Sequence, residues 1–318
     1  MKPGASAGGY REELRTRFRG ALVGAVVGDA LGAPFEGYPH QLSAGQLDGV
    51  TTAVSELRYT DDTALTHALA ESLIARGSLD LDHLAGRFSS AYSRDPHRGY
   101  GAGAAHLLER VAAGEDWRGL AANQFGGRGS FGNGAAMRVA PVALLAYPAV
   151  NRAVSMGRSS ASVTHTHPEA IDAAGIQAAA VALALTTAAG VDRFAVDHLL
   201  SQATTPSLRK ALRAVAQLKP SSTAAQVAAV TGTGIRAVEA VPAALAAVLL
   251  NMQSFSATVR FAITLGGDTD TIASMAGAIA GARLGEQAIP TAWRAQVEGA
   301  RQAGNLADRL WMKKYGES

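Results

Sequence analysis

The sequence predicts an all-α protein folded as one domain with many helices. Apolar residues recur with the period of an α-helix along most of the 318-residue chain. The period-2 alternation that indicates strands is scarce, and short β-branched runs such as Val50–Val54 are isolated. No regular succession of strand and helix patterns occurs, so a Rossmann-type sheet is not expected.

Helices are expected wherever an apolar-periodic run is bounded by Gly, Pro or a capping Asp, Ser or Thr. The first nine residues, MKPGASAGG, are expected to be a flexible leader, which leaves residues 10–318 as the domain. Glycine clusters at Gly28–Gly37, Gly99–Gly103 and Gly126–Gly134 indicate sharp turns or close backbone approach to a ligand. The expected helices are Glu12–Asp29, Asp62–Arg76, Asp80–Ser93, Asn133–Tyr147, Pro168–Gly190, Ile235–Met252 and Asp270–Gly285.

The composition excludes several classes of protein. There is no cysteine, so disulfides and thiolate zinc sites are excluded. The net charge of +3 is compatible with an anionic ligand and lacks the strong basic excess of nucleic-acid-binding proteins. The apolar runs Gln177–Gly190 and Ala237–Met252 are shorter than a membrane span, and no signal-peptide pattern precedes the domain. A cytoplasmic monomer without membrane or nucleic-acid partners is therefore expected.

Two helix starts carry pairs of carboxylates. In Gly266–Gly281, GGDTDTIASMAGAIAG, Asp268 and Asp270 precede a run of small apolar residues. One aspartate can cap a helix by accepting hydrogen bonds from its first amides, but a second is not needed for that purpose. Tyr59–Leu65, YTDDTAL, repeats the arrangement with Asp61 and Asp62.

Two further acids lie near the end of the first apolar helix: Asp29 is its last residue, and Glu36 follows it. If the fold brings all these carboxylates together, they form an oxygen-rich site of the kind that selects Mg²⁺, Mn²⁺ or Ca²⁺. So many buried carboxylates would repel one another without cations, which favours two metal ions over one. The alternative is that each cluster caps its own helix and faces water.

The remaining motifs are less specific on their own. Gly126–Gly134, GGRGSFGNG, could present backbone amides to a phosphate, but it lacks the lysine of a Walker loop and equally suits a tight connection with Phe131 in the core. His165 and His167 have no evident third ligand, which favours a structural or hydrogen-bonding role over zinc.

Taken together, these segments resemble the ADP-ribosylglycohydrolase family, and within it the type that removes ADP-ribose from serine. The resemblance implies a compact orthogonal multi-helix domain with a central binuclear metal site. YTDDTAL paired with GGDTDT is specific to the family, whereas GYGAG and GSFGNGAAMR indicate the serine type. The segments that carry the resemblance are FRGALVGAVVGDALGAPFEG, YTDDTAL, DPHRGYGAG, GSFGNGAAMRVA, Thr164-His165, GTGIRAVEAVP and GGDTDTIASMAGAIAGA.

The resemblance also assigns site residues. It implies two Mg²⁺ or Mn²⁺ ions as cofactors and a glutamate, Glu36, that is required for activity. We further expect Asp268 or Asp270 to share the proton transfer, and the sequence leaves that choice open. Phe131 stands where the animal enzymes usually carry tyrosine, so stacking is retained and a phenol hydrogen bond is lost. The implied metal ligands are Thr60, Asp61, Asp62, Asp268, Asp270 and Thr271. The implied substrate contacts are Gly99, Gly103, Gly129, Ser130, Phe131, Gly132, Asn133, His165 and Ile235.

The expected reaction is metal-dependent hydrolysis of the O-glycosidic bond between ADP-ribose and serine in ADP-ribosylated proteins. Poly(ADP-ribose) and O-acetyl-ADP-ribose are further candidate substrates, because their ADP-ribose is also O-linked. Three alternatives remain open at this point: hydrolysis of arginine-linked ADP-ribose, a two-metal phosphohydrolase acting on a nucleotide diphosphate, and a non-catalytic ADP-ribose-binding protein.

Overall fold

The computed structural model describes residues 7–38, 48–49, 57–186 and 193–316, and within them it is helical and contains no strand. Two isolated bridges, Leu57 with Val297 and Gly132 with Arg236, join loop segments. The expected β-branched run Val50–Val54 lies outside the described residues. The prediction of an all-α fold is therefore confirmed for the part of the chain that can be compared.

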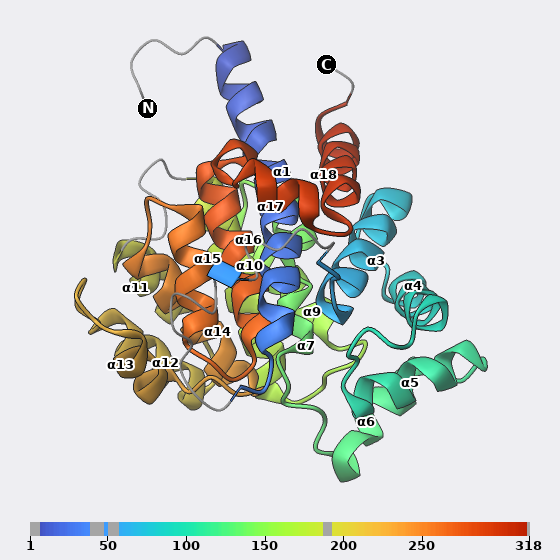
Figure 1. Ribbon diagram of the computed structural model, residues 1–318. Helices are drawn as coiled ribbons and strands as arrows, with labels where there is room; N and C mark the ends of the chain where they lie inside the picture. Colours follow the sequence, from blue (N-terminus) through green and yellow to red (C-terminus); the bar gives the residue numbers. More distant parts are fainter. Residues whose placement is uncertain (1–6, 39–47, 50–56, 187–192, 317–318) are drawn as a thin grey trace.

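Helices α1, α10 and α16 run through the centre of the molecule (Figure 1). Those that carry or support the site are α1 Ala7–Gly32, η1 Ala33–Phe35, α3 Asp61–Arg76, α7 Gly134–Met137, α10 Pro168–Thr186, α14 Ala237–Leu250 and α16 Thr269–Leu284. The others are α4 Leu81–Arg94, α5 Ala102–Ala112, α6 Trp117–Gly127, α8 Ala140–Ala146, α9 Val150–Ala161, α11 Arg193–Gln202, α12 Pro206–Ala216, α13 Ala224–Thr231, α15 Phe255–Thr264, η2 Glu286–Ala288, α17 Thr291–Gln296 and α18 Ala300–Tyr315.

Most of the expected helices are present, with shifted ends. The first helix begins at Ala7, so residues 7–9 of the expected leader are helical, while residues 1–6 lie outside the described part. The expectation of one helix over Asn133–Tyr147 is wrong, because the segment forms two, α7 and α8. Pro141 lies in the first turn of α8, where its missing N–H costs nothing, and it could not continue a helix from α7.

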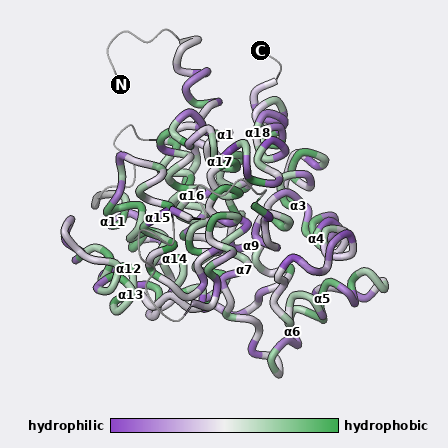
Figure 2. Tube along the Cα trace, viewed as in Figure 1, coloured by the Kyte–Doolittle hydropathy of each residue, from purple (hydrophilic) through white to green (hydrophobic). Residues whose placement is uncertain are grey.

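Two helices are long and apolar enough to cross a membrane by length and composition alone, 8–35 and Pro168–Thr186. The second contains the first part of the run Gln177–Gly190, of which 187–190 lie outside the described residues. Most of each apolar window, 83% and 78%, is buried inside the protein. Figure 2 shows hydrophobic residues along these central helices and mixed colouring along outer helices such as α4 and α18. Core helices pass the same test, so it is weak evidence for a membrane span.

The closest helix pair is α1 with α16, which run antiparallel through a row of glycines. Gly20, Gly24, Gly28 and Gly32 face residues 281, 277, 273 and 269 in turn. A Cβ atom added to any of the four would lie 2.1–2.5 Å from a carbonyl oxygen of α16. Only hydrogen fits at these positions, so the two backbones are in direct contact. This packing places the end of α1, with Asp29 and Glu36 nearby, beside the start of α16.

Replacing Gly28 with alanine is therefore expected to destabilise the protein by about 1–3 kcal/mol or more, since the two helices must separate to admit a methyl group. Chemical denaturation measures the effect. Gly86 in α4 is the matched control, because nothing lies within 4 Å of an added Cβ there. The same substitution at Gly86 is expected to stabilise by up to about 1 kcal/mol, as alanine favours the helix. Equal effects at both positions would contradict close packing at Gly28.

Candidate metal centre and adjoining cleft

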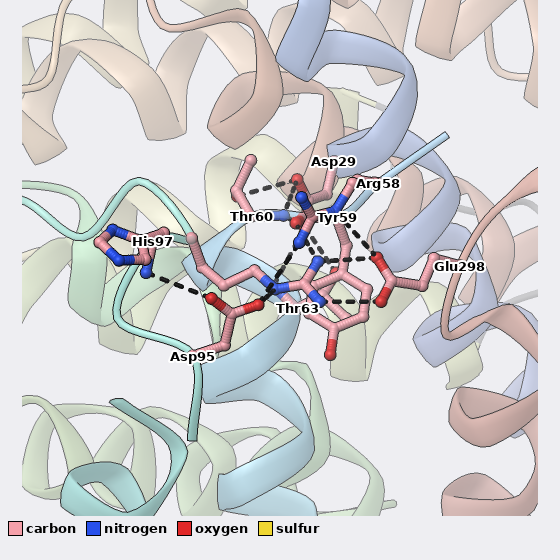
Figure 3. Close-up of polar contacts among 9 residues, drawn as sticks. Asp29, Arg58, Tyr59, Thr60, Thr63, Asp95, His97 and Glu298 are labelled. Atoms are coloured by element: carbon pink, nitrogen blue, oxygen red, sulfur yellow. Dashed lines mark hydrogen bonds and ion pairs between the residues drawn. The ribbon is translucent and has the colours of Figure 1, made fainter. Parts of the chain in front are cut away.

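The buried carboxylate of Asp29 organises the start of α3. It accepts hydrogen bonds from the backbone amides of Thr60 and Thr63, each at 3.1 Å, and from their hydroxyls at 2.9 and 2.5 Å (Figure 3). Thr60 in turn caps α3 by accepting a bond from the amide of Asp62. Asp29 therefore holds the loop in place, and the carboxylates of Asp61 and Asp62 are not needed to cap this helix.

The same loop is fixed from its other side by Arg98. The carbonyl oxygen of Arg98 accepts the amide of Asp61 at 2.7 Å. Its guanidinium donates to both carboxylate oxygens of Glu298, at 2.7 and 2.8 Å, and to the carbonyl of Tyr59 at 3.0 Å. It also covers the Tyr59 ring at 4.0 Å, and Asp95 completes the network (Figure 3). A forked arginine pair of this kind restricts the orientation of the loop that presents Asp61.

At the start of α16, Asp268 does not act as a helix cap. Its side chain accepts no bond from the helix amides and instead accepts the side-chain amide of Asn133 at 2.5 Å. Its backbone amide donates to the carbonyl of Thr233 at 2.8 Å. Gly267 has a φ of +75°, and a Cβ there would lie 2.2 Å from that carbonyl. The tight turn at Gly267 therefore aims Asp268 toward the centre of the protein and away from its own helix.

Helices α3 and α16 meet through Asp62, Asp270 and Thr271. The hydroxyl of Thr271 donates to Oδ2 of Asp62 at 3.2 Å, and Oδ1 of Asp270 accepts the amide of Thr271 at 2.8 Å. All three side chains are buried. Oδ1 of Asp62 is buried and has no hydrogen-bond partner among the described residues. A buried carboxylate oxygen without a donor is costly, and a cation would satisfy it.

The fold brings the predicted acids into one cluster. Glu36 lies at its exposed edge, and one carboxylate oxygen from each of Glu36, Asp268 and Asp270 lies within 4.8 Å of the others. Burial and the Asp29 carboxylate raise the pKa of Asp61 to about 8, and burial and Asp268 raise the pKa of Asp270 to about 10. Burial and Asp268 also raise the pKa of Glu36. None of these acids forms a salt bridge within the part of the chain that the structure describes, so the donor set fits one or more hard, oxygen-preferring cations.

This electrostatic arrangement predicts how stability depends on pH when no divalent cation is bound. The pKa values of Asp61 and Asp270, about 8 and about 10 in the folded protein, exceed the ordinary value of 3.8. Their contribution to stability is complete at low pH and is lost as the pH rises through those values. Magnesium replaces the lost protons, so the rise in Tm caused by MgCl₂, relative to EDTA, is expected to grow between about pH 5 and about pH 8.5. Thermal melts measure this, and a pH-independent rise would contradict it.

A cavity of about 310 Å³ adjoins the acidic cluster. Ile235 lines it and is 65% exposed, so this side chain offers apolar surface at the cavity. Of the sequence-predicted residues, the cavity wall contains Glu36, Asp61, Asp62, Gly99, Gly103, Ser130, Gly132, Asn133, His165, Ile235, Asp268, Asp270 and Thr271. The cavity wall does not include Thr60, Gly129 and Phe131, although each is adjacent in sequence to a residue that lines it.

The predicted glycine loop pairs with the segment before α14. The amide of Asn133 donates to the carbonyl of Ile235 at 2.9 Å, and the amide of Ala237 donates to the carbonyl of Phe131 at 3.1 Å. Gly129 is a structural glycine, since φ is +74° and a Cβ would lie 2.2 Å from the hydroxyl of Thr166. This pairing joins the loop to Ile235, and Gly132, Asn133 and Ile235 all line the cavity.

The Phe131 ring is 43% exposed, so the alternative that it belongs to the core is wrong. It lies beside two polar residues, with His167 edge-on at 6.0 Å and the guanidinium of Arg236 at 5.6 Å from the ring centroid. His165 and His167 have separate roles. His165 lines the cavity, whereas Nδ1 of His167 accepts the amide of Glu169.

Sequence reasoning missed Phe125 and Arg138. Phe125 lines the cavity, is 55% exposed, and has a φ of +53° that is rare for a residue other than glycine. Strained, exposed aromatic residues of this kind often mark binding sites, but no sequence pattern reports the strain. Arg138 is fully buried and donates to Thr164, and its signal in the sequence was a lone charge within the apolar run Ala135–Ala146.

Comparison with known proteins identifies the family of this chain. The family model of ADP-ribosylglycohydrolases matches residues 11–318. The chain is 38% identical over 338 residues to ADP-ribosylhydrolase ARH3 of Danio rerio, with 94% of this chain and 90% of that protein covered. The human ADP-ribosylhydrolase ARH3 is 35% identical, with 93% of each chain covered.

A solved structure of an ADP-ribosylglycohydrolase-related protein complex also matches. It has a TM-score of 0.71 and 29% identity, and 95% of this chain and 99% of that chain are covered. The residues matched by the family model include both acidic helix starts. The chain therefore belongs to the ADP-ribosylglycohydrolase family and is a hydrolase that acts on glycosyl bonds.

Proposed function

We propose that this protein hydrolyses the O-glycosidic bond between ADP-ribose and serine side chains of proteins, with divalent cations as cofactors. The observation that carries the proposal is the shared cavity, which joins a carboxylate cluster on α3 and α16 to the loop Ser130–Asn133 and the exposed Ile235. Relatives named ADP-ribosylhydrolase ARH3 are 34–38% identical over almost the whole chain, which supports the same class of bond.

Two Mg²⁺ or Mn²⁺ ions are proposed, because the cluster supplies more carboxylates than one ion needs. When bound, they supply charge neutralisation and orient the hydroxyls of a sugar and a water molecule. The clearest support for a bound cation is Oδ1 of Asp62, which is buried and has no hydrogen-bond partner among the described residues. The residues proposed to hold the ions are Thr60, Asp61, Asp62, Asp268, Asp270 and Thr271.

Hydrolysis forms a bond between a water oxygen and the anomeric carbon of the ribose and breaks the bond from that carbon to the serine oxygen. The water loses a proton and the serine oxygen gains one, so a carboxyl group at the edge of the cluster must transfer it. Glu36 has this position, and burial and the Asp268 carboxylate raise its pKa, which is the direction that a proton-exchanging carboxyl group needs. Asp268, fixed by the amide of Asn133, holds the neighbouring position.

The rest of the cavity is proposed to hold ADP-ribose away from the cluster. Ser130 and Gly132 lie where backbone and hydroxyl groups can bind the diphosphate. Gly99 and Gly103 line the wall without side chains, which leaves room for the ligand. Phe125 and Ile235 offer the exposed apolar surface that a planar adenine ring requires.

The test measures ADP-ribose release from a serine-linked peptide and from an arginine-linked protein, each with MgCl₂ and with EDTA. Release from serine only in MgCl₂ is the expected result. Release from arginine alone would replace the proposed substrate while keeping the site, and phosphate release from ADP-ribose would indicate a phosphohydrolase. Binding of ADP-ribose without any release would indicate a non-catalytic binding protein. Free poly(ADP-ribose), added as a third substrate, determines whether the polymer is also cleaved.

A further inference from the structure

Arg138, between α7 and α8, has the largest side chain that is fully buried. Its Nη2 donates to the hydroxyl of Thr164 at 2.7 Å, and its guanidinium lies 4.2 Å from the centroid of the Phe88 ring. Its Nε and Nη1 atoms have no hydrogen-bond partner within the described ranges. Burial lowers the pKa of Arg138 to about 9 and the Asp61 carboxylate acts in the other direction, so the group is cationic at neutral pH.

The direction of the hydrogen bonds follows from the donor inventory. A guanidinium carries only donors, so Thr164 Oγ1 must accept from Arg138. The hydroxyl has one proton to donate, and Nδ1 of His165 lies 2.7 Å away. If Nδ1 carried a proton instead, the hydroxyl of Thr164, which is 1% exposed, would have no acceptor among its neighbours in the described structure. A buried donor without an acceptor is unfavourable, so Thr164 donates and Nδ1 accepts.

A neutral imidazole that accepts at Nδ1 carries its proton on Nε2. The Nε2 atom of His165 faces the glycine loop of the cavity, since Cβ atoms built on Gly132 and Gly134 would lie 3.5 and 3.2 Å from it. Burial and the Arg138 cation lower the pKa of His165 to about 3, so the ring is neutral at physiological pH. Nε2–H is consequently a neutral donor directed at the loop.

We propose that Arg138 and Thr164 are positioning residues that hold His165 as its Nε2–H tautomer, so that His165 donates a hydrogen bond to a substrate oxygen beside Gly132. The tautomer follows from the three side chains alone. The identity of the acceptor, a diphosphate or ribose oxygen of ADP-ribose, rests on the proposed function. Without the fixed tautomer, a fraction of the molecules would carry the proton on Nδ1. In those molecules the lone pair of Nε2 would face the oxygen atoms of the ligand and repel them.

The first test is nuclear magnetic resonance of the ¹⁵N-histidine-labelled protein without ligand, which distinguishes the two tautomers by their ring nitrogen shifts. Wild-type His165 is expected as Nε2–H. Thr164→Ser keeps the hydroxyl and should keep this tautomer, whereas Thr164→Val, of similar size, should give a mixture or Nδ1–H. The proposal is overturned if wild type shows Nδ1–H, or if Thr164→Val leaves the tautomer unchanged. This measurement does not depend on any activity, so it tests the tautomer of His165 independently of the proposed function.

The second test compares His165→Gln with His165→Asn by calorimetry with ADP-ribose. The glutamine amide can place a donor near the position of Nε2, and the asparagine amide near that of Nδ1. His165→Gln is expected to bind ADP-ribose about tenfold more tightly than His165→Asn. Equal affinities, both much weaker than wild type, would show that His165 does not act through an Nε2 donor. If wild type itself fails to bind ADP-ribose while showing Nε2–H, the assigned acceptor and the proposed function fail together and the tautomer assignment stands.

Discussion

Glu36→Gln is expected to lower kcat for ADP-ribose release by about 10²- to 10⁴-fold, with little change in fold or metal affinity. Glutamine has almost the same shape as glutamate but cannot exchange a proton. Glu36 is the exposed member of the cluster, so the substitution disturbs little packing. Kinetics with serine-linked peptide and excess MgCl₂ measure the change.

Calorimetric titration with Mg²⁺ provides the control that the centre is intact. Glu12→Gln on the exposed start of α1 serves as the matched substitution and should leave kcat unchanged. A Glu36→Gln enzyme that retains kcat within about threefold of wild type would remove Glu36 from proton transfer. A parallel loss of Mg²⁺ affinity would instead make it a metal ligand.

Asp270→Asn is expected to have two opposite effects. The affinity for Mg²⁺ should fall by about 100-fold or more, because a charged ligand becomes a neutral one. The metal-free protein should become more stable at about pH 8. Burial and Asp268 raise the pKa of Asp270 to about 10, so folding at that pH requires the ionised aspartate of the unfolded chain to take up a proton. Asparagine removes this cost. Titration calorimetry and thermal melts in EDTA measure the two effects. Asp61→Asn should behave in the same way.

Asp172→Asn is the matched control for a buried aspartate outside the centre. Its carboxylate accepts bonds from Arg158 and from the amides of Thr204 and Thr205, and despite burial these bonds lower its pKa. Asparagine there should destabilise the protein and leave Mg²⁺ affinity unchanged. If Asp270→Asn also destabilised the metal-free protein and bound Mg²⁺ normally, the cluster would be a structural network and not a metal centre.

The helix starts could be predicted because they depend on local sequence. Thr-Asp-Asp and Asp-Thr-Asp before apolar-periodic runs indicated both the beginnings of α3 and α16 and an excess of carboxylates over what capping needs. The structure shows that Thr60 caps α3 and that Asp268 caps nothing. The excess acids are therefore available for another role, as their number suggested.

Other features could not be predicted because they depend on contacts between distant segments. Periodicity identifies the buried face of a helix but not the helix that packs on it, so the contact of Gly24 in α1 with Gly277 in α16 appears only in the fold. The sequence identifies Asp29 only as one more acid for the cluster, whereas its hydrogen bonds to Thr60 and Thr63 show that it supports the loop before α3.

The sequence by itself determined the helical class and the carboxylates of the cluster, because residue type and short spacing specify these. Most of the cavity wall followed only from the resemblance to the family, since the glycine loops are not specific on their own. The tertiary structure alone decided which partners these side chains contact and which conformations they adopt. It made Phe125 a strained wall of the cavity, paired Asn133 with Asp268, and connected Arg138 through Thr164 to His165. Each of these depends on a hydrogen-bond partner or backbone angle that is set only when distant helices pack together.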